Sequence, residues 1–175
     1  VPVRRSSLLS RKRLLDLFSG LLDVQLFLVI APAGYGKTSL LIDLANSSEL
    51  SFCWYTLDEL DQEFDKFLLY FCAAISNRFS KFAPIRDAVT QMAGSGGLSP
   101  SALARFLAHA VFETIQEHFV FVLDDFQQVG KTPEINEFID VFIQQASENV
   151  HLVILSRSLL QLPNLPLLIA RSQVA

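Results

Sequence analysis

The chain has 175 residues, which is enough for one domain, and 51% of them are hydrophobic, including 15 phenylalanines. Its formal net charge of −4 argues against direct binding of this segment to DNA, because a phosphate backbone requires a basic face. No apolar run approaches the roughly 18 residues that span a bilayer, and no signal-peptide pattern opens the chain, so we expect a cytoplasmic domain without a membrane partner.

The first element that carries chemistry is a glycine-rich turn, residues 31–38, between an apolar strand and a helix. Residues 26–30 (LFLVI) are a continuous apolar run, typical of a strand buried on both faces of a parallel sheet, and we expect a helix from residue 37 to about residue 46. The turn matches the phosphate-loop pattern G-x-x-x-x-G-K-[ST] except that Ala31 replaces the first glycine.

The chemistry of this turn suits a nucleoside triphosphate. Gly34 and Gly36 allow positive φ angles, so that successive N–H groups can face a phosphate at the positive end of the helix. Lys37 adds a mobile ammonium group and Thr38 a hydroxyl for magnesium. The alternative is a chance Gly-Lys-Thr in a surface turn, which the flanking strand and helix disfavour. The residues expected to bind nucleotide are Ala33, Gly34, Tyr35, Gly36, Lys37, Thr38 and Ser39.

The middle of the chain predicts a strand over residues 51–56 and a helix from about residue 64 to residue 78. Residues 82–98 contain Pro84 and a Gly-Ser-Gly-Gly run, and we interpret them as a mobile connection. Ser99 is a candidate N-cap, with Pro100 at the first helical position of a helix that runs to about His118.

Two carboxylates follow the next apolar run, FVFVL at residues 119–123. In open parallel sheets, ligands bind outside the carboxyl ends of the strands. We therefore expect Asp124 to hold magnesium opposite Thr38, and Asp125 to orient or polarise the attacking water. The alternative is a strand end with two solvated carboxylates.

The last third of the chain predicts a helix from Pro133 to about residue 146 and a strand over residues 151–157 that ends in Arg157. We expect Arg157 to reach the γ-phosphate, and we predict that it acts in catalysis together with Lys37 and Asp125. The alternative for Arg157 is an ordinary surface arginine. Residues 162–166 predict a proline-broken loop, and residues 167–174 predict one last strand.

Strands that alternate with helices predict a three-layer α/β/α sandwich on a parallel sheet. Because the chain stops at its last predicted strand, we interpret residues 1–175 as one domain cut from a longer protein. Cys53 and Cys72 lie inside apolar segments and are expected to be buried free thiols. The three histidines have no spacing typical of a zinc site.

Several segments in order, APAGYGKTSLL, FCWYTLDELDQEFDKFLLYF, FVFVLDDFQQV, LVILSR and LPLLIARSQVA, resemble the ATPase domain of transcriptional regulators related to the bacterial maltose-regulon activator. That family belongs to the signal-transduction ATPases with numerous domains, within the P-loop NTPase superfamily. The resemblance covers nearly the whole chain. It implies a five-stranded parallel sheet in the order 5-1-4-3-2.

The resemblance also implies roles for individual residues. Lys37 and Thr38 match the Walker A lysine and hydroxyl, Asp124 and Asp125 the Walker B pair, and Arg157 the sensor 1 arginine. Residues 8–15 resemble the adenine-side motif of the family, with Ser10 where the wider class has glycine, which implies adenine contacts by Leu9 and Arg11. Trp54 and Asp58 match a further family segment, although Trp54 also suits a core position and Asp58 a helix cap.

For function, the resemblance implies a switch that binds ATP or ADP with Mg²⁺ and hydrolyses ATP slowly. ATP would permit self-association of the parent protein, and ADP would keep it inactive. The partners implied are a winged-helix domain, a helical-repeat sensor and a helix-turn-helix DNA reader elsewhere in the parent chain.

Two alternatives stay open. A P-loop small-molecule kinase would use the same loop but should carry an arginine-rich lid, and no such lid is apparent in the sequence. A non-hydrolysing module would hold nucleotide as a structural ligand, which Asp124, Asp125 and Arg157 disfavour without excluding. A GTPase would need an N/T-K-x-D base-reading motif, which the sequence lacks.

Overall fold

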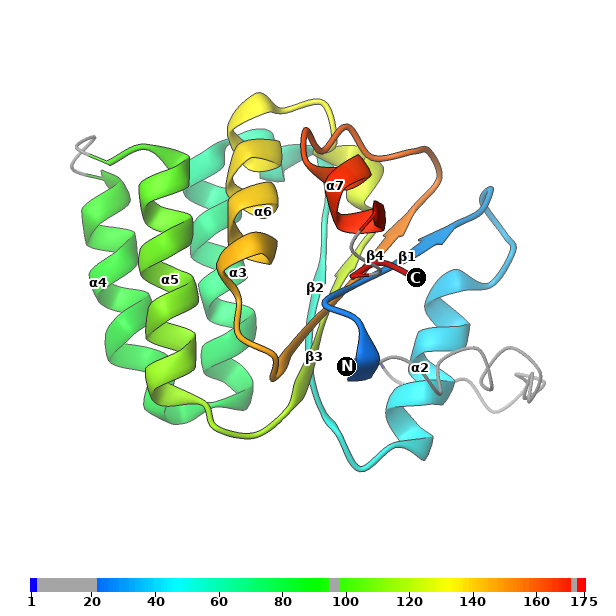
Figure 1. The fold of residues 1–175 in the computed structure, drawn as a ribbon, viewed down its shortest axis with the longest axis horizontal. Coiled ribbons are helices and arrows are strands. Elements are labelled where there is room, and N and C mark those ends of the chain that lie inside the picture. Colours follow the sequence, from blue (N-terminus) through cyan, green and yellow to red (C-terminus); the bar gives the residue numbers. More distant parts are fainter. Residues whose placement is uncertain (3–21, 95–97, 171–172) are drawn as a thin grey trace.

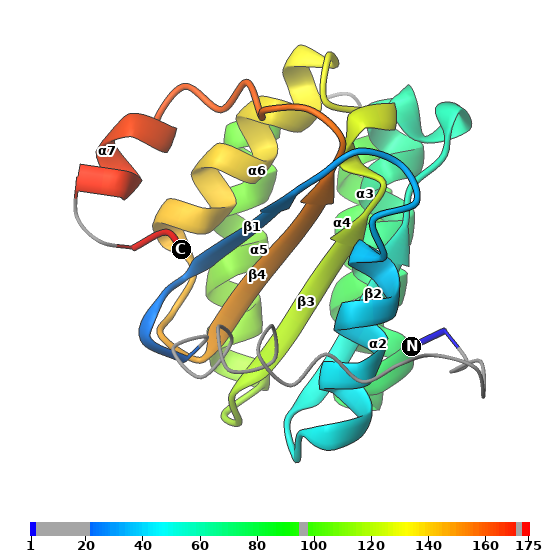
Figure 2. The ribbon, with the colours of Figure 1, turned by 90° about the vertical axis from the view of Figure 1, so that its right-hand side faces the viewer.

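The computed structural model describes residues 1–2, 22–94, 98–170 and 173–175. Within these residues the chain forms a parallel four-stranded sheet in the order β1-β4-β3-β2 (Figure 2). The strands are β1 (Leu26–Ile30), β2 (Ser51–Thr56), β3 (Phe119–Asp124) and β4 (Val150–Ser156). The sheet confirms the α/β class and the 1-4-3-2 part of the expected order.

Helices cover both faces of the sheet, so the three expected layers are present (Figure 1). One face carries α3 (Phe64–Arg78), α4 (Ala83–Gly94), α5 (Pro100–Thr114) and α6 (Pro133–Gln145), and the other carries α2 (Lys37–Ser47). Short 3-10 turns lie at η2 (Glu59–Gln62), η3 (Ser80–Phe82) and η4 (Phe126–Gln128).

The central strands divide their side chains between two cores, because successive residues of a strand point to opposite faces. Phe119, Phe121 and Leu123 of β3 join the large core under the four helices, whereas Val120 and Val122 join the smaller core under α2. All the residues of β3 are buried, as expected for a continuous apolar run in a parallel sheet.

Phenylalanines fill much of the large core. The ring centroid of Phe71 lies 4.4 Å from that of Phe121, 5.3 Å from that of Phe138 and 5.2 Å from that of Phe142. These contacts join α3 to β3 and to α6, so the helical layer is fixed against the strand that ends in Asp124. The phenylalanines thus account for much of the packing between the helical layer and β3.

The expectation of a mobile connection at residues 82–98 is wrong for most of its length, because residues 83–94 form helix α4. Phe82 and Val89 are fully buried, and Ile85 and Met92 pack against the same core. Their spacing of three or four residues is helical, and Pro84 is tolerated because it lies in the first helical turn. The apolar spacing therefore outweighs the proline and glycine signals. Residues 95–97 lie outside the described residues.

The end of the chain also differs from the expected loop and strand. Residues 165–170 form the short helix α7, whose Leu168 is buried in the large core. Among the described residues, Val174 makes a strand-like bridge to Leu26 on the outer edge of β1, and the sheet has four strands where the resemblance implies five. The bridge nevertheless lies at the predicted place of the fifth strand.

Two smaller boundaries differ as well. Helix α5 ends at Thr114 and not near His118, because Ile115 closes the helix through its N–H to Val111 O and the chain then turns into β3. Arg157 lies one residue beyond β4. In the part of the chain that the structure describes, no helix is long and apolar enough to cross a membrane.

Candidate functional site

The turn of residues 31–38, the predicted phosphate turn, connects the end of β1 to the start of α2. Gly34 has φ 82° and Gly36 has φ 80°, values that L side chains rarely adopt. A Cβ atom at Gly34 would meet nothing within 4 Å, so the backbone angle, and not crowding, accounts for glycine there. Gly36 is the N-cap of α2 and offers no side-chain cap, which leaves the first N–H groups of the helix available to an anion.

Lys37 is nearly buried, and its ammonium group donates hydrogen bonds to two carbonyl groups of its own turn. Nζ donates to Ala31 O at 2.7 Å and to Pro32 O at 3.3 Å. Two carbonyl dipoles thus compensate the ammonium charge. A phosphate offers the same cation a stronger, charged acceptor, so the lysine is held close to where a phosphate would lie.

Thr38 and Asp124 join the helix start to the tip of β3. Thr38 Oγ1 donates a hydrogen bond of 2.9 Å to Asp124 Oδ2, and the backbone N–H of Asp125 donates to Oδ1 at 2.9 Å. Asp124 is 2% exposed, and its burial raises the pKa of its carboxyl group. The negative charge of Asp125 also raises that pKa, whereas the Thr38 hydrogen bond and the charge of Lys37 lower it.

This pair of oxygens fits a magnesium ion. A hydroxyl and a carboxylate oxygen are hard ligands of the kind that Mg²⁺ prefers. A divalent cation would also compensate the buried charge of Asp124, which its present neighbours offset only in part. The expected Mg²⁺ ligands are therefore adjacent in the structure.

Asp125 and Arg157 meet across the ends of β3 and β4. Asp125 has φ 57° and ψ 39°, a left-handed conformation, so the chain turns sharply after the strand. One guanidinium nitrogen of Arg157 lies 3.4 Å from Asp125 Oδ1. Both side chains are partly exposed, at 49% for Arg157 and 33% for Asp125, so solvent screens this ion pair.

Gln127 completes this corner, and sequence reasoning missed it. Its Nε2 donates to Asp125 Oδ1 at 2.8 Å, and its Oε1 accepts a hydrogen bond of 3.1 Å from the backbone N–H of Arg157. A polar residue two positions after a strand-end carboxylate is the only signal in the sequence that points to it.

A cavity of about 300 Å³ lies between these elements. Its lining consists of Ala33, Gly34, Gly36, Lys37, Thr38, Ser39, Asp125 and Arg157. Tyr35 does not line the cavity and its side chain is 65% exposed. Leu9 and Arg11, the expected adenine contacts, lie outside the described residues. The roles expected for all these residues remain predictions.

Asp58 and Trp54, which match a further segment of the family, make contacts within the fold. Asp58 caps the turn η2, since its carboxylate accepts from the Leu60 N–H at 2.7 Å while Asp61 accepts from the Asp58 N–H at 2.8 Å. Trp54 packs on the smaller core, and its Nε1 donates to Thr56 Oγ1 at 3.2 Å. Neither residue lines the cavity at the phosphate turn.

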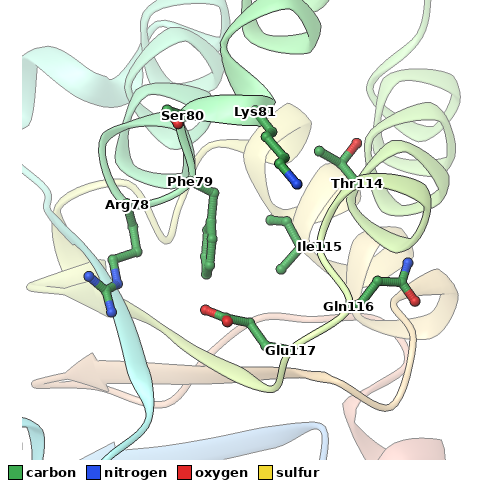
Figure 3. Close-up of a pocket in the computed structure, with 8 residues that line it drawn as sticks. All are labelled: Arg78, Phe79, Ser80, Lys81, Thr114, Ile115, Gln116 and Glu117. Carbon is green, nitrogen blue, oxygen red and sulfur yellow. The ribbon is translucent and has the colours of Figure 1, made fainter.

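A larger cavity, of about 440 Å³, opens at the opposite edge of the sheet, where β2 and β3 begin (Figure 3). Two cations, Arg78 and Lys81, line it. Arg78 donates to Ser51 Oγ at 2.9 Å, and Ser51 in turn donates to Glu117 Oε1 at 2.8 Å. The arginine thus already has a partner and the rim carries a carboxylate, so this cavity is a poorer site for a polyphosphate.

Two of the three histidines, His118 and His151, lie close together in space although they are 33 positions apart in the sequence. His118 Nδ1 lies 2.9 Å from His151 Nε2. Within the described residues, no group of three or more histidine, cysteine or acidic side chains could hold a metal ion.

Comparisons with known proteins agree with the fold and the sequence resemblance. The chain is 33% identical over 162 residues to the HTH-type transcriptional regulator MalT of two Klebsiella pneumoniae strains, MGH 78578 and 342. The match covers 92% of this chain but 17% of the length of these curated relatives. No protein-family model matches the chain.

Solved structures with the same fold include a Walker-type ATPase of Pyrococcus abyssi, with a TM-score of 0.56 and 16% identity over 88% of this chain and 47% of that protein. The Aeropyrum pernix ORC1 protein, solved in complex with DNA, has a TM-score of 0.55 and 18% identity over 93% of this chain and 42% of that one. At these identities the likeness establishes a shared fold alone.

Proposed function

We propose that this chain, a homologue of part of the MalT-type transcriptional regulators with the fold of a P-loop ATPase, binds ATP and ADP with Mg²⁺ and acts as the nucleotide switch of a longer bacterial regulator. The observation that carries the proposal is that Lys37 and Thr38 line one cavity while Thr38 Oγ1 also donates a hydrogen bond of 2.9 Å to Asp124 Oδ2. Residues that would bind phosphate and residues that would bind the metal ion are thereby adjacent, although they come from the separate elements α2 and β3.

Each residue has a role that its contacts support. The N–H groups of the turn after β1 would bind phosphate oxygens, and Lys37 would exchange the carbonyl groups of Ala31 and Pro32 for phosphate. Thr38 and Asp124 would hold Mg²⁺, which when bound neutralises charge on the phosphate groups. Asp125 would accept a hydrogen bond from the attacking water, and Arg157 would bind the terminal phosphate.

Switching follows from the terminal phosphate. A ligand shifts a conformational equilibrium only by its different affinity for the two states, and ATP carries one charged group more than ADP for Arg157 to bind. We propose that residues 1–175 are one domain, that the parent chain adds winged-helix, helical-repeat and helix-turn-helix domains, and that ATP promotes its self-association. Hydrolysis of ATP by this chain is expected to be slow. A bacterial regulator that binds DNA would act in the cytoplasm, and we propose that location for the parent protein.

Calorimetric titration with ATP, ADP and GTP in the presence of Mg²⁺ tests the proposal. We expect both adenine nucleotides to bind, GTP to bind more weakly, and Lys37→Ala to weaken ATP binding by about 10- to 100-fold, the range for loss of a charged partner. Lys81→Ala is the matched control, because Lys81 lies on the rim of the larger, opposite cavity. Equal ATP affinity in the wild type and Lys37→Ala would exclude the phosphate turn as the nucleotide-binding site. Loss of ATP binding in Lys81→Ala alone would exclude it as well.

The same samples separate a switch from the two alternatives. Slow release of phosphate from ATP without an added acceptor supports the ATPase. Binding without any release in the wild type supports a non-hydrolysing module, and acceptor-dependent ADP formation supports a kinase.

A further inference from the structure

Gln127 connects the ends of two strands through one side-chain amide. It lies half-buried in the 3-10 turn η4, directly after the acidic tip of β3. The amide nitrogen donates to the carboxylate of Asp125 at 2.8 Å, and the amide oxygen accepts from the backbone N–H of Arg157 at 3.1 Å. The same residue therefore holds the carboxylate expected to face the water and the backbone of the residue expected to face the terminal phosphate.

The backbone of Gln127 is well anchored. Phe126, its neighbour, is 1% exposed and packs into the large core. The Gln128 N–H donates to Asp125 O at 3.0 Å, and the Val129 N–H donates to Phe126 O at 3.1 Å. Because these contacts hold the backbone of Gln127 on both sides, its amide can keep the carboxylate of Asp125 in one orientation.

Asp125 needs such a support because it lies beyond the ladder of β3. Its backbone is left-handed, and the pairings of β3 with its neighbours end at Asp124, so the sheet does not fix the backbone of Asp125. Arg157 contacts the same oxygen, Oδ1, at the longer distance of 3.4 Å, and this ion pair is partly exposed. Arg157 is thus the weaker of the two partners and the one that can leave.

We propose that Gln127 is a positioning residue that keeps Asp125 in place while Arg157 exchanges Asp125 for the terminal phosphate of a triphosphate. A diphosphate lacks that group, so Arg157 stays on Asp125. Gln127 then contributes to the distinction between ATP and ADP and leaves the binding of their shared phosphates unchanged. This inference rests on the proposed function, because it assigns the regulation of the same site.

Three variants test the role of Gln127. Gln127→Met keeps the length of the side chain and removes both hydrogen bonds. Gln127→Glu keeps the acceptor for Arg157 but sets a second carboxylate against Asp125. Gln128→Met is the matched control in the same turn, because Gln128 contacts Gln62 through its backbone carbonyl group, which the substitution keeps. Thermal unfolding of each variant shows whether the fold is kept.

The readouts are the ATP and ADP dissociation constants with Mg²⁺, and kcat and KM for ATP. We expect ADP affinity in Gln127→Met to stay within about twofold of the wild type, and ATP affinity to fall by about five- to tenfold, the effect of one net hydrogen bond. We expect kcat to fall by about tenfold or more, since misplaced groups at a reacting centre cost that much. Gln127→Glu should be affected at least as strongly, and Gln128→Met should match the wild type.

The failures are distinguishable. If the wild type binds neither nucleotide, the proposed function is wrong and this inference falls with it. If the wild type binds both, but the ATP and ADP constants of Gln127→Met change by the same factor or not at all, Gln127 has no positioning role and nucleotide binding stands. Loss of folding in both Gln127 variants would also overturn the inference, in favour of a purely structural role.

Discussion

Thr38 Oγ1 donates a hydrogen bond of 2.9 Å to Asp124 Oδ2, and this bond joins residues that are 86 positions apart in the chain. It links the first turn of α2 to the carboxyl end of β3, and so holds the two expected magnesium ligands next to each other.

Asp124→Asn is expected to raise thermal stability and to abolish the gain in ATP affinity that Mg²⁺ provides. Burial raises the pKa of Asp124, which means that the folded state disfavours its ionised form, and an amide removes that cost. The amide can still accept from the Asp125 N–H while donating to the Thr38 hydroxyl. Thermal unfolding, and ATP titrations with Mg²⁺ or with EDTA, measure the two effects. A lower Tm, or an unchanged response to Mg²⁺, would contradict the assignment.

Stability should fall in mild acid because of His151. This residue is 2% exposed, and burial lowers its pKa, with a further lowering from His118 and an opposing effect of the hydrogen bond from Nδ1 to Val24 O. The unfolded chain, with a histidine pKa of about 6.5, therefore binds more protons than the folded chain below that pH. The contribution of His151 to the free energy of unfolding is thus expected to decrease as pH falls below about 6.5, whereas the raised pKa of Asp124 acts in the opposite direction.

Urea unfolding at pH 7.5, 6.5 and 5.5 measures this dependence. His151→Asn is the matched variant, because an amide can keep the donor to Val24 O but does not titrate. The decrease should be smaller in the variant. Parallel pH curves for the two proteins would show that another group is responsible.

The two cysteines are expected to be inert in the folded protein. Both are free and buried, and burial raises the pKa of Cys53 and of Cys72 to about 12. Because the thiolate is the reactive form, a disulfide reagent at pH 8 should modify neither thiol in native protein and both in denaturant. Rapid modification of either thiol in native buffer would contradict this burial.

Helix α4 offers a test of the region where sequence reasoning was wrong. Val89 is fully buried, and Val89→Ala should lower the free energy of unfolding by on the order of 2 kcal/mol, the cost of a cavity in a packed core. Gln91→Ala, exposed on the same helix, should change it by less than about 0.5 kcal/mol. Denaturant melts decide the point, since equal effects of the two substitutions would indicate a mobile segment.

The phosphate turn was predictable because its chemistry is contiguous: two glycines, a lysine and a hydroxyl lie between a strand and a helix. The meeting of Asp124 with Thr38 followed from a rule of topology, that parallel strands present their carboxyl ends at one edge. Gln127 was not predictable in the same way. Its two partners lie 2 and 30 positions away, and an uncharged amide has no pattern that distinguishes it from a surface residue.

Helices α4 and α7 differ from the sequence prediction for another physical reason. Proline and glycine favour a break in residues 82–98, and proline alone in residues 162–166, whereas Pro84 and Pro166 each lie in the first turn of a helix. Burial of Val89 in one case and of Leu168 in the other outweighs the local signals. Tertiary packing of this kind depends on residues far along the chain and is not visible in a short window of sequence.

The position of Lys37 Nζ in a crystal structure with Mg²⁺ and a slowly hydrolysed ATP analogue tests nucleotide binding most directly. We expect the phosphate groups to lie against the turn of Gly34 and Gly36, and Nζ to leave Ala31 O, now 2.7 Å away, for a phosphate oxygen. An analogue bound at the opposite cavity, or bound with the Lys37 contact to Ala31 intact, would contradict the assignment of the phosphate turn.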